Sequence, residues 1–180
     1  MLELFLDSRE VYLDDKNLFV TTKPMTLRLE HSLVSIAKWE TKWRKPFLDR
    51  SGRKTYEESI DYIRCMTINQ NVDPVIYYSL TSDEIKKIND YIDTDFTATT
   101  FKNTFNAPSN EIITSELIYY QLVAFRIPFE CQKWNFSRLL ALLQICRIKS
   151  EPGKKMSKQA IMNQNRALNA ARRKKLHSKG

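Results

Sequence analysis

The chain has 180 residues, of which 42% are hydrophobic and 11% aromatic, so one compact domain with a short appendage is expected. Glycine occurs three times, which favours helices over a turn-rich β fold and excludes a glycine-rich phosphate-binding loop. The net charge of +8 comes from residues 150–180, with nine Lys or Arg and one acid, whereas residues 1–149 hold twenty of each and are neutral.

Residues 1–30 carry short runs in which apolar and polar residues alternate, such as the run containing Leu2, Leu4 and Leu6. Polar turns, including residues 14–17, separate these runs. Short alternating runs of this kind are typical of a small antiparallel sheet or a meander. We therefore predict an N-terminal β-rich element over residues 1–30.

A helix is predicted from Leu33 to about Arg44, because Ile36, Trp39 and Trp43 recur at three- and four-residue spacing. The stripe that these three residues form is typical of core packing, and base stacking on the tryptophans is the less favoured alternative.

Two capping boxes predict the starts of further helices: one pairs Thr55 with Glu58, and the other pairs Thr81 with Glu84. Asp73, followed by Pro74, fits the start of a short helix between them. After these helices, residues 96–101 have β propensity and are predicted to pair with residues 111–113.

Residues 114–148 form the most apolar part of the chain and are predicted to fold as two helices joined by an elbow at Ile127 and Pro128. A helix that is apolar on nearly every face lies in a core or docks on a partner. The polar interruptions, among them Arg126 and Arg138, exclude a membrane span, which needs about 20 apolar residues.

A last, weakly amphipathic helix is predicted over residues 158–176. This helix lies within residues 150–180, the segment that supplies the basic excess of the chain. Such a segment can bind an acidic protein surface, bind nucleic acid phosphates, or remain solvated, and the protein partner is the favoured interpretation. The basic residues of this tail are Lys154, Lys155, Lys158, Arg166, Arg172, Arg173, Lys174 and Lys175.

The sequence thus predicts an α+β fold that is mostly helical: a β-rich element (1–30), a helical core domain (31–150) and a basic C-terminal helix (151–180). With no export signal apparent and an odd number of cysteines without a C-x-x-C pair, we expect a reducing compartment and free thiols.

No catalytic, metal-binding or cofactor-binding residue is predicted, and the protein is expected not to be an enzyme. The two histidines, His31 and His177, are too few for a usual zinc site, and His31 fits packing or capping. A nucleophile at Cys131, or a Mg²⁺ site combining Glu130 with other acids such as Glu111 or Glu116, is less favoured than a structural elbow.

Several strings together carry a family resemblance: HSLVSIAKWE (31–40), KPFL (45–48), ITSE (113–116) with Tyr119 and Tyr120, IPFECQKW (127–134) with RLL (138–140), and LNAARR (168–173). This set resembles a family of small proteins of tailed double-stranded DNA bacteriophages that is associated with the tail assembly chaperone role. The resemblance covers most of residues 31–176.

The resemblance implies a non-enzymatic chaperone that coats the tape measure protein, a very long helical chain, in the host cytoplasm. Copies of the protein would associate side by side, without a cofactor or a membrane. An apolar groove is needed for such a partner, and the candidate partner-binding residues are Trp39, Trp43, Pro128, Phe129, Trp134 and Phe136. Two alternatives remain: a structural component of the virion tail tip or baseplate, and a nucleic-acid-binding protein that uses the basic tail.

Overall fold

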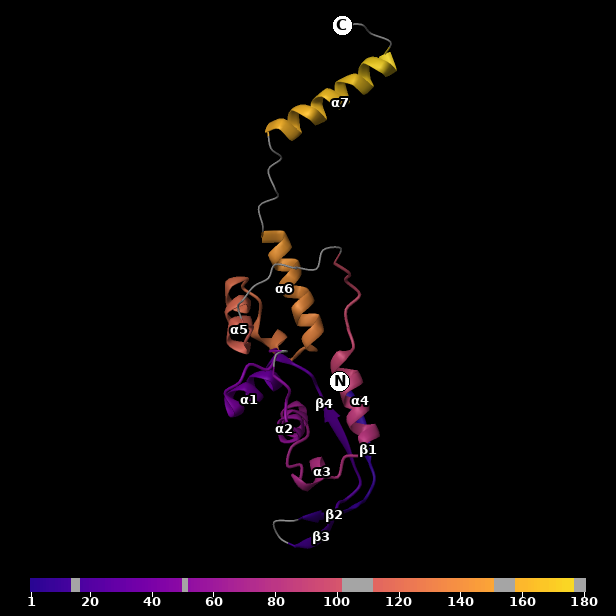
Figure 1. Ribbon diagram of the computed structural model, residues 1–180, viewed down its shortest axis with the longest axis vertical. Helices are drawn as coiled ribbons and strands as arrows, with labels where there is room; N and C mark the ends of the chain where they lie inside the picture. Colours follow the sequence, from indigo (N-terminus) through magenta and orange to yellow (C-terminus); the bar gives the residue numbers. More distant parts are fainter. Residues whose placement is uncertain (14–16, 50–51, 102–111, 151–157, 177–180) are drawn as a thin grey trace. The chain divides into compact units, whose positions relative to one another are not determined.

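The structure is a computed structural model that describes residues 1–13, 17–49, 52–101, 112–150 and 158–176. The predicted α+β, mostly helical class is confirmed, with antiparallel strand pairs near the N-terminus and a basic helix near the C-terminus (Figure 1). Residues 1–145 form one compact unit and residues 146–180 a second one. The elements are β1 (Leu2–Leu6), β2 (Glu10–Leu13), β3 (Leu18–Thr21), β4 (Met25–Leu29), α1 (Leu33–Trp43), α2 (Tyr56–Met66), α3 (Val75–Tyr78), α4 (Ser82–Asp93), α5 (Ser115–Ala124), the 3₁₀ helix η1 (Phe129–Lys133), α6 (Phe136–Ser150) and α7 (Lys158–Leu176).

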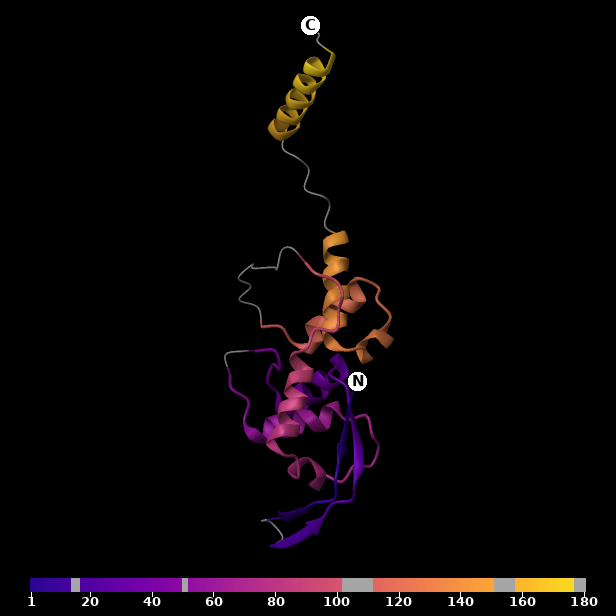
Figure 2. The same cartoon turned by 90° about the vertical axis from the view of Figure 1, so that its right-hand side faces the viewer.

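The four strands form two nested antiparallel pairs, β1 with β4 and β2 with β3. Leu4 of β1 faces Leu27 of β4, and both side chains are buried. Phe5, the next residue of β1, lies on the opposite face of the strand pair and is 62% exposed. The antiparallel pairing agrees with the sequence, but the meander order is wrong, because β1 pairs with β4 rather than with β2. The β1–β4 pair lies alongside α4, as Figure 2 shows from the side.

An ion pair fixes the start of the inner strand pair to α4. The Arg9 guanidinium, just before β2, donates to both carboxylate oxygens of Glu84 at 2.7 and 2.8 Å and to the Ser79 carbonyl at 3.0 Å. The hydrogen bonds from Arg9, together with the Thr81 amide at 2.8 Å, lower the pKa of Glu84 to about 2. This bidentate contact anchors the β ribbon to the helical part of the same unit.

Side-chain caps begin the helices where the sequence predicts them. Thr55 and Glu58 cap α2, and Thr81 and Glu84 cap α4, each with both hydrogen bonds of the box. At α3 the prediction is one residue off, because the N-cap is Pro74 rather than Asp73, and the Asp73 carboxylate accepts the Val75 amide at 3.0 Å. These helices therefore start at positions fixed by local chemistry.

Aromatic rings fill the centre of the unit formed by residues 1–145. His31 lies 5.3 Å from the ring of Phe136 and 5.9 Å from that of Tyr62, and Tyr62 packs against Phe47 at 4.1 Å. The Tyr62 hydroxyl and Nδ1 of His31 share a hydrogen bond, and burial raises the pKa of the phenol and lowers that of the imidazole to about 4. His31 is thus a neutral packing residue, as the sequence indicates.

The predicted strand pair of residues 96–101 with 111–113 is wrong for the residues that the structure describes, since neither 96–101 nor 112–113 contains a strand. Instead, the Phe96 amide donates to Ser137 Oγ at 2.9 Å, and the Phe96 ring packs 5.2 Å from Tyr91. These tertiary contacts override the β propensity of the segment. Glu111 lies outside the described residues.

A buried carboxylate connects α1 to the start of α5. The Glu40 side chain accepts the Phe47 amide on Oε1 and the Ser115 amide on Oε2, both at 2.8 Å. Glu40 is 9% exposed, and Ser115 is the first residue of α5. The negative charge therefore meets the positive end of the α5 dipole as well as two backbone donors.

We expect Glu40→Gln to lower the free energy of unfolding by about 2 kcal/mol, because an amide group can accept only one of these two N–H groups and turns a donor toward the other. Urea unfolding followed by far-ultraviolet circular dichroism measures the change. Glu116→Gln, which removes an exposed acid from the first turn of the same α5, is the matched control. Equal losses for both variants would contradict the bridging role of Glu40.

His31 makes stability depend on pH. Its pKa is lowered by burial from 6.5 to about 4, so its stabilising neutral form is fully favoured above pH 6.5, and the stabilisation is lost as pH falls toward 4. We expect the unfolding free energy to fall by about 1 kcal/mol per pH unit between pH 6.5 and 4.5, above the range in which Glu84 begins to be protonated. Urea titrations should show this slope for the natural chain and for His177→Asn, but not for His31→Asn. An unchanged slope in His31→Asn would contradict the assignment.

Candidate partner-binding surface

The elbow between α5 and α6 lies where the sequence predicts it. After α5, Arg126 adopts a left-handed conformation with φ of 54°, and the Ile127 amide donates to the Leu122 carbonyl at 2.8 Å. Pro128 then begins η1, consistent with its fixed φ and missing N–H group. The Tyr119 hydroxyl of α5 donates to Gln132 Oε1 of η1 at 2.9 Å and so holds the two elements together.

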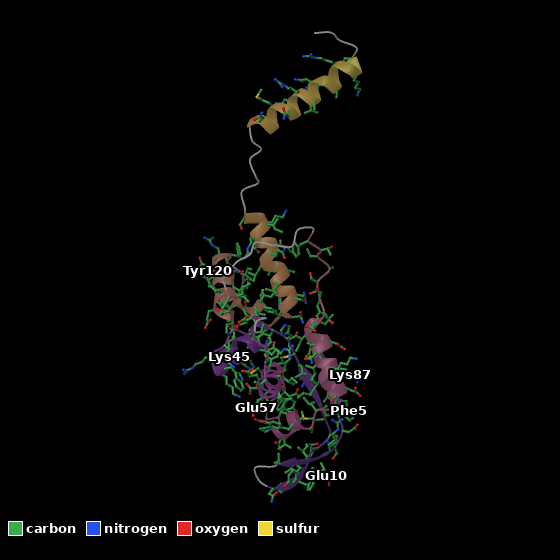
Figure 3. The ribbon with its side chains drawn as sticks, in the orientation of Figure 1. Phe5, Glu10, Lys45, Glu57, Lys87 and Tyr120 are labelled. Carbon is green, nitrogen blue, oxygen red and sulfur yellow. The ribbon has the colours of Figure 1, made fainter. Side chains whose placement is uncertain are left out.

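The helix α5 is apolar on two opposite faces, but only one of them is buried. Ile118 and Leu122 are 1% and 0% exposed, whereas Tyr120 and Val123 are 69% and 60% exposed. Figure 3 shows Tyr120 at the outer edge of α5. A solvent-facing helix surface is ordinarily polar, so this outer face is a candidate for a protein contact.

Two further apolar side chains of the elbow are exposed, Phe129 at 52% and Trp134 at 40%. The Phe129 ring lies 6.4 Å from that of Tyr119, and the Arg138 guanidinium lies 5.2 Å from the Trp134 ring. We name the set formed by Tyr120, Val123, Phe129 and Trp134 the α5–η1 surface. Exposed charged residues of the same segment, Arg126, Glu130 and Lys133, accompany it.

The six partner-binding residues predicted from the sequence divide into two groups. Pro128, Phe129 and Trp134 are exposed, and Trp43 is half-buried. The prediction is wrong for Trp39 and Phe136, which are 1% and 4% exposed and so lie in the core.

Both corrections have a physical cause. Nε1 of Trp39 donates to the Glu58 carbonyl at 2.8 Å, so the indole is held between α1 and α2. The Phe136 amide donates to the His31 carbonyl at 2.8 Å, which seats the ring in the aromatic core. Neither side chain is available to a partner in this conformation.

Trp43 borders a polar pocket rather than an apolar groove. Its Nε1 donates to Asp61 Oδ2 at 2.9 Å, and Lys42 pairs with the other oxygen of the same carboxylate. The pocket has a volume of about 270 Å³ and is also lined by Arg64 and Tyr77. Trp43 therefore has its polar atom satisfied and shows only part of its ring.

Sequence reasoning missed Tyr120 and Val123 as candidate contact residues. The signal was present, because α5 was predicted to be apolar on nearly every face, and a helix in a small unit can rarely bury all of them. What the sequence did not reveal is which face is turned inward. That orientation depends on Glu40 and on the elbow contacts.

Of the residues considered for chemistry, Glu130 and Cys131 lie in η1, and Glu116 lies on α5. Cys131 is buried in η1, while Glu116 and Glu130 are exposed on separate elements. No group of three or more His, Cys, Asp or Glu side chains suited to a metal ion occurs among the described residues. The arrangement at the elbow offers exposed apolar area with charges around it, which suits association with another chain.

The helix α7 carries six basic residues and no acid. Arg166, Arg172, Arg173 and Lys175 are exposed, as are the apolar residues Met162 and Leu168. Lys154 and Lys155, and the side chains of Lys158 and Lys174, lie outside the part that the structure describes.

Comparisons with known proteins returned no match to a family model, to a curated protein or to a solved structure. Within the described ranges, no helix has both the length and the apolar character needed to cross a bilayer.

Proposed function

We propose that the protein is a non-enzymatic bacteriophage tail assembly factor, a chaperone for the tape measure protein that acts in the host cytoplasm. Two observations support the proposal: the set of strings that resembles the tail assembly chaperone family, and the α5–η1 surface. The exposure of Tyr120, Val123, Phe129 and Trp134 on one short segment carries it.

The α5–η1 surface has the composition that a helix-binding surface requires. An amphipathic helix docks through apolar anchors spaced along one of its faces, and aromatic side chains supply most of the contact energy in such interfaces. Full burial of one such side chain contributes about 1.5–3 kcal/mol. The charged residues Arg126, Glu130 and Lys133 would form the polar rim that fixes the register of the bound helix.

A chaperone of this kind keeps a long amphipathic chain soluble until tube subunits polymerise around it. The partner must leave at that stage, so each copy should bind weakly and many copies should bind side by side. A small exposed surface on a rigid elbow fits this requirement better than a deep, fully enclosed groove.

We expect Phe129→Ser to reduce co-purification of the tape measure protein at least about tenfold upon co-expression, because truncating an interface anchor commonly costs 2 kcal/mol or more. The control is Phe5→Ser, which removes an equally exposed phenylalanine from β1 of the same unit, labelled in Figure 3. Thermal unfolding should be nearly unchanged in both variants, since both rings are more than half exposed.

Wild-type recovery of the tape measure protein by Phe129→Ser would contradict the assignment of the α5–η1 surface. The alternative of a virion component of the tail tip or baseplate gives a different result. Mass spectrometry of purified particles would then find the protein in stoichiometric amount, whereas a transient chaperone is absent from them.

A second candidate function is binding to duplex DNA through α7. The observation that favours it is the run of nineteen residues with six cations and no acid. Arg166 and Arg173 share one face of the helix with Asn163, a combination able to meet both phosphates and base edges.

The test is a fluorescence anisotropy titration of a short DNA duplex across a salt series. The double variant Arg172→Gln and Arg173→Gln should lower the affinity and reduce the slope of log K against log salt by about 2, which corresponds to two lost phosphate contacts. Lys86→Gln with Lys87→Gln, a pair of exposed neighbours on α4, is the matched control. Equal effects of both double variants, or full competition by polyglutamate, would contradict a DNA-specific role for α7.

A further inference from the structure

A largely apolar slot opens between α2 and α4, two helices of the unit formed by residues 1–145. Its volume is about 340 Å³, and we define it by Lys54, Tyr56, Ile60, Ile63, Ile85 and Ile92, with Phe47 and Asn89 at its edges. Figures 1 and 2 show the two helices that border it. Its residues come from neither α5 nor η1, so it is separate from the α5–η1 surface.

The slot exists because the apolar stripe of α4 is only partly covered. Ile85, Ile88 and Ile92 follow one another at helical spacing, and Ile88 is 0% exposed. Ile85 and Ile92 are only half-buried, and both line the slot. Facing them, the buried Ile60 and Ile63 of α2 form an apolar floor, while Tyr56 stands more than half exposed.

One cation is placed among these apolar walls. Lys54 is the single charged residue among the described residues that line the slot, and its Nζ lies 4.2 Å from the ring centroid of Phe47. The ammonium donates to the Phe47 carbonyl at 2.9 Å, which uses one of its three donors. The charges of Glu58 and Asp49 act on this ammonium, and Glu58 already accepts from Lys45 and from the Thr55 amide.

Lys54 is exposed, but partial desolvation lowers the pKa of its ammonium group, and the charges of Glu58 and Asp49 offset part of this effect. The hydrogen bond to the Phe47 carbonyl uses one of three donors, so the ammonium can still donate to an added anion. An anion that also fills the apolar part of the slot would satisfy both features at once.

We propose that this slot binds a small amphiphile, an apolar chain or ring that ends in a carboxylate. The apolar part would pack between the isoleucines of α2 and α4, and the carboxylate would accept from Lys54. The volume lies near the lower end of the range of about 300–1,000 Å³ found for small-ligand pockets, so the apolar part is short. This inference stands independently of the proposed function.

Octanoate is the probe, and methyl-labelled isoleucine provides the signal. In a nuclear magnetic resonance titration of the full chain, the methyl groups of Ile60, Ile63, Ile85 and Ile92 should shift, while those of the buried Ile36 and Ile118 should not. Octanol should shift the same four methyl groups with at least about tenfold weaker affinity, since it lacks the charged hydrogen bond to Lys54.

Lys54→Met keeps the apolar stem of the side chain and removes its charge, so the preference for octanoate over octanol should disappear while octanol still binds. Lys87→Met, on the exposed side of α4, should retain the preference. Asn89→Trp, which places a ring at the edge of the slot, should abolish binding of both probes.

Three results would overturn the proposal. They are the absence of shifts in the slot methyl groups, equal shifts in the core isoleucines, and an octanoate preference that persists in Lys54→Met. Unchanged shifts of Ile36 and Ile118 in the probe-free spectra show that each variant is folded.

Discussion

The two apolar helices α5 and α6 depend on contacts with α1 and with His31, two residues before its start. The Glu40 carboxylate holds the first amide of α5 at 2.8 Å, and the His31 carbonyl holds the Phe136 amide, the first of α6, at the same distance. A buried carboxylate is costly unless its oxygens are satisfied, and here both accept backbone N–H groups. Glu40 of α1 and His31 therefore fix the starting points of two helices that are distant in sequence.

These contacts determine which faces of α5 and η1 are left exposed. With its first residue held by Glu40 and its last turn tied to the elbow, α5 can turn only Ile118 and Leu122 into the core. The left-handed Arg126 and the Tyr119–Gln132 hydrogen bond then set the direction of η1. The apolar residues on the outer side are thus carried by a backbone whose course is set by hydrogen bonds, and such preorganisation lowers the entropic cost of binding.

Local signals in the sequence predicted much of the fold, whereas contacts between residues distant in sequence could not be predicted. The capping boxes at Thr55 and Thr81 and the strand alternation in residues 1–30 depend on neighbours within four residues, so they could be identified. The pairing of β1 with β4 depends on non-local contacts. The same applies at the candidate site, where the predicted Phe129 and Trp134 are exposed, but Trp39 is buried and its indole donates to a carbonyl of α2.

Residues 1–149 carry no net charge, yet the fold distributes their acids and cations unevenly. The buried acids Glu58, Asp61 and Glu84 each engage one cation, respectively Lys45, Lys42 and Arg9, while Glu40 is satisfied by backbone amides alone. Acids that are committed inside the fold cannot neutralise cations elsewhere. Lys54 donates to a carbonyl group at the edge of an apolar slot, a position that only the folded chain reveals. The excess of cations in α7, by contrast, can be predicted from the sequence alone.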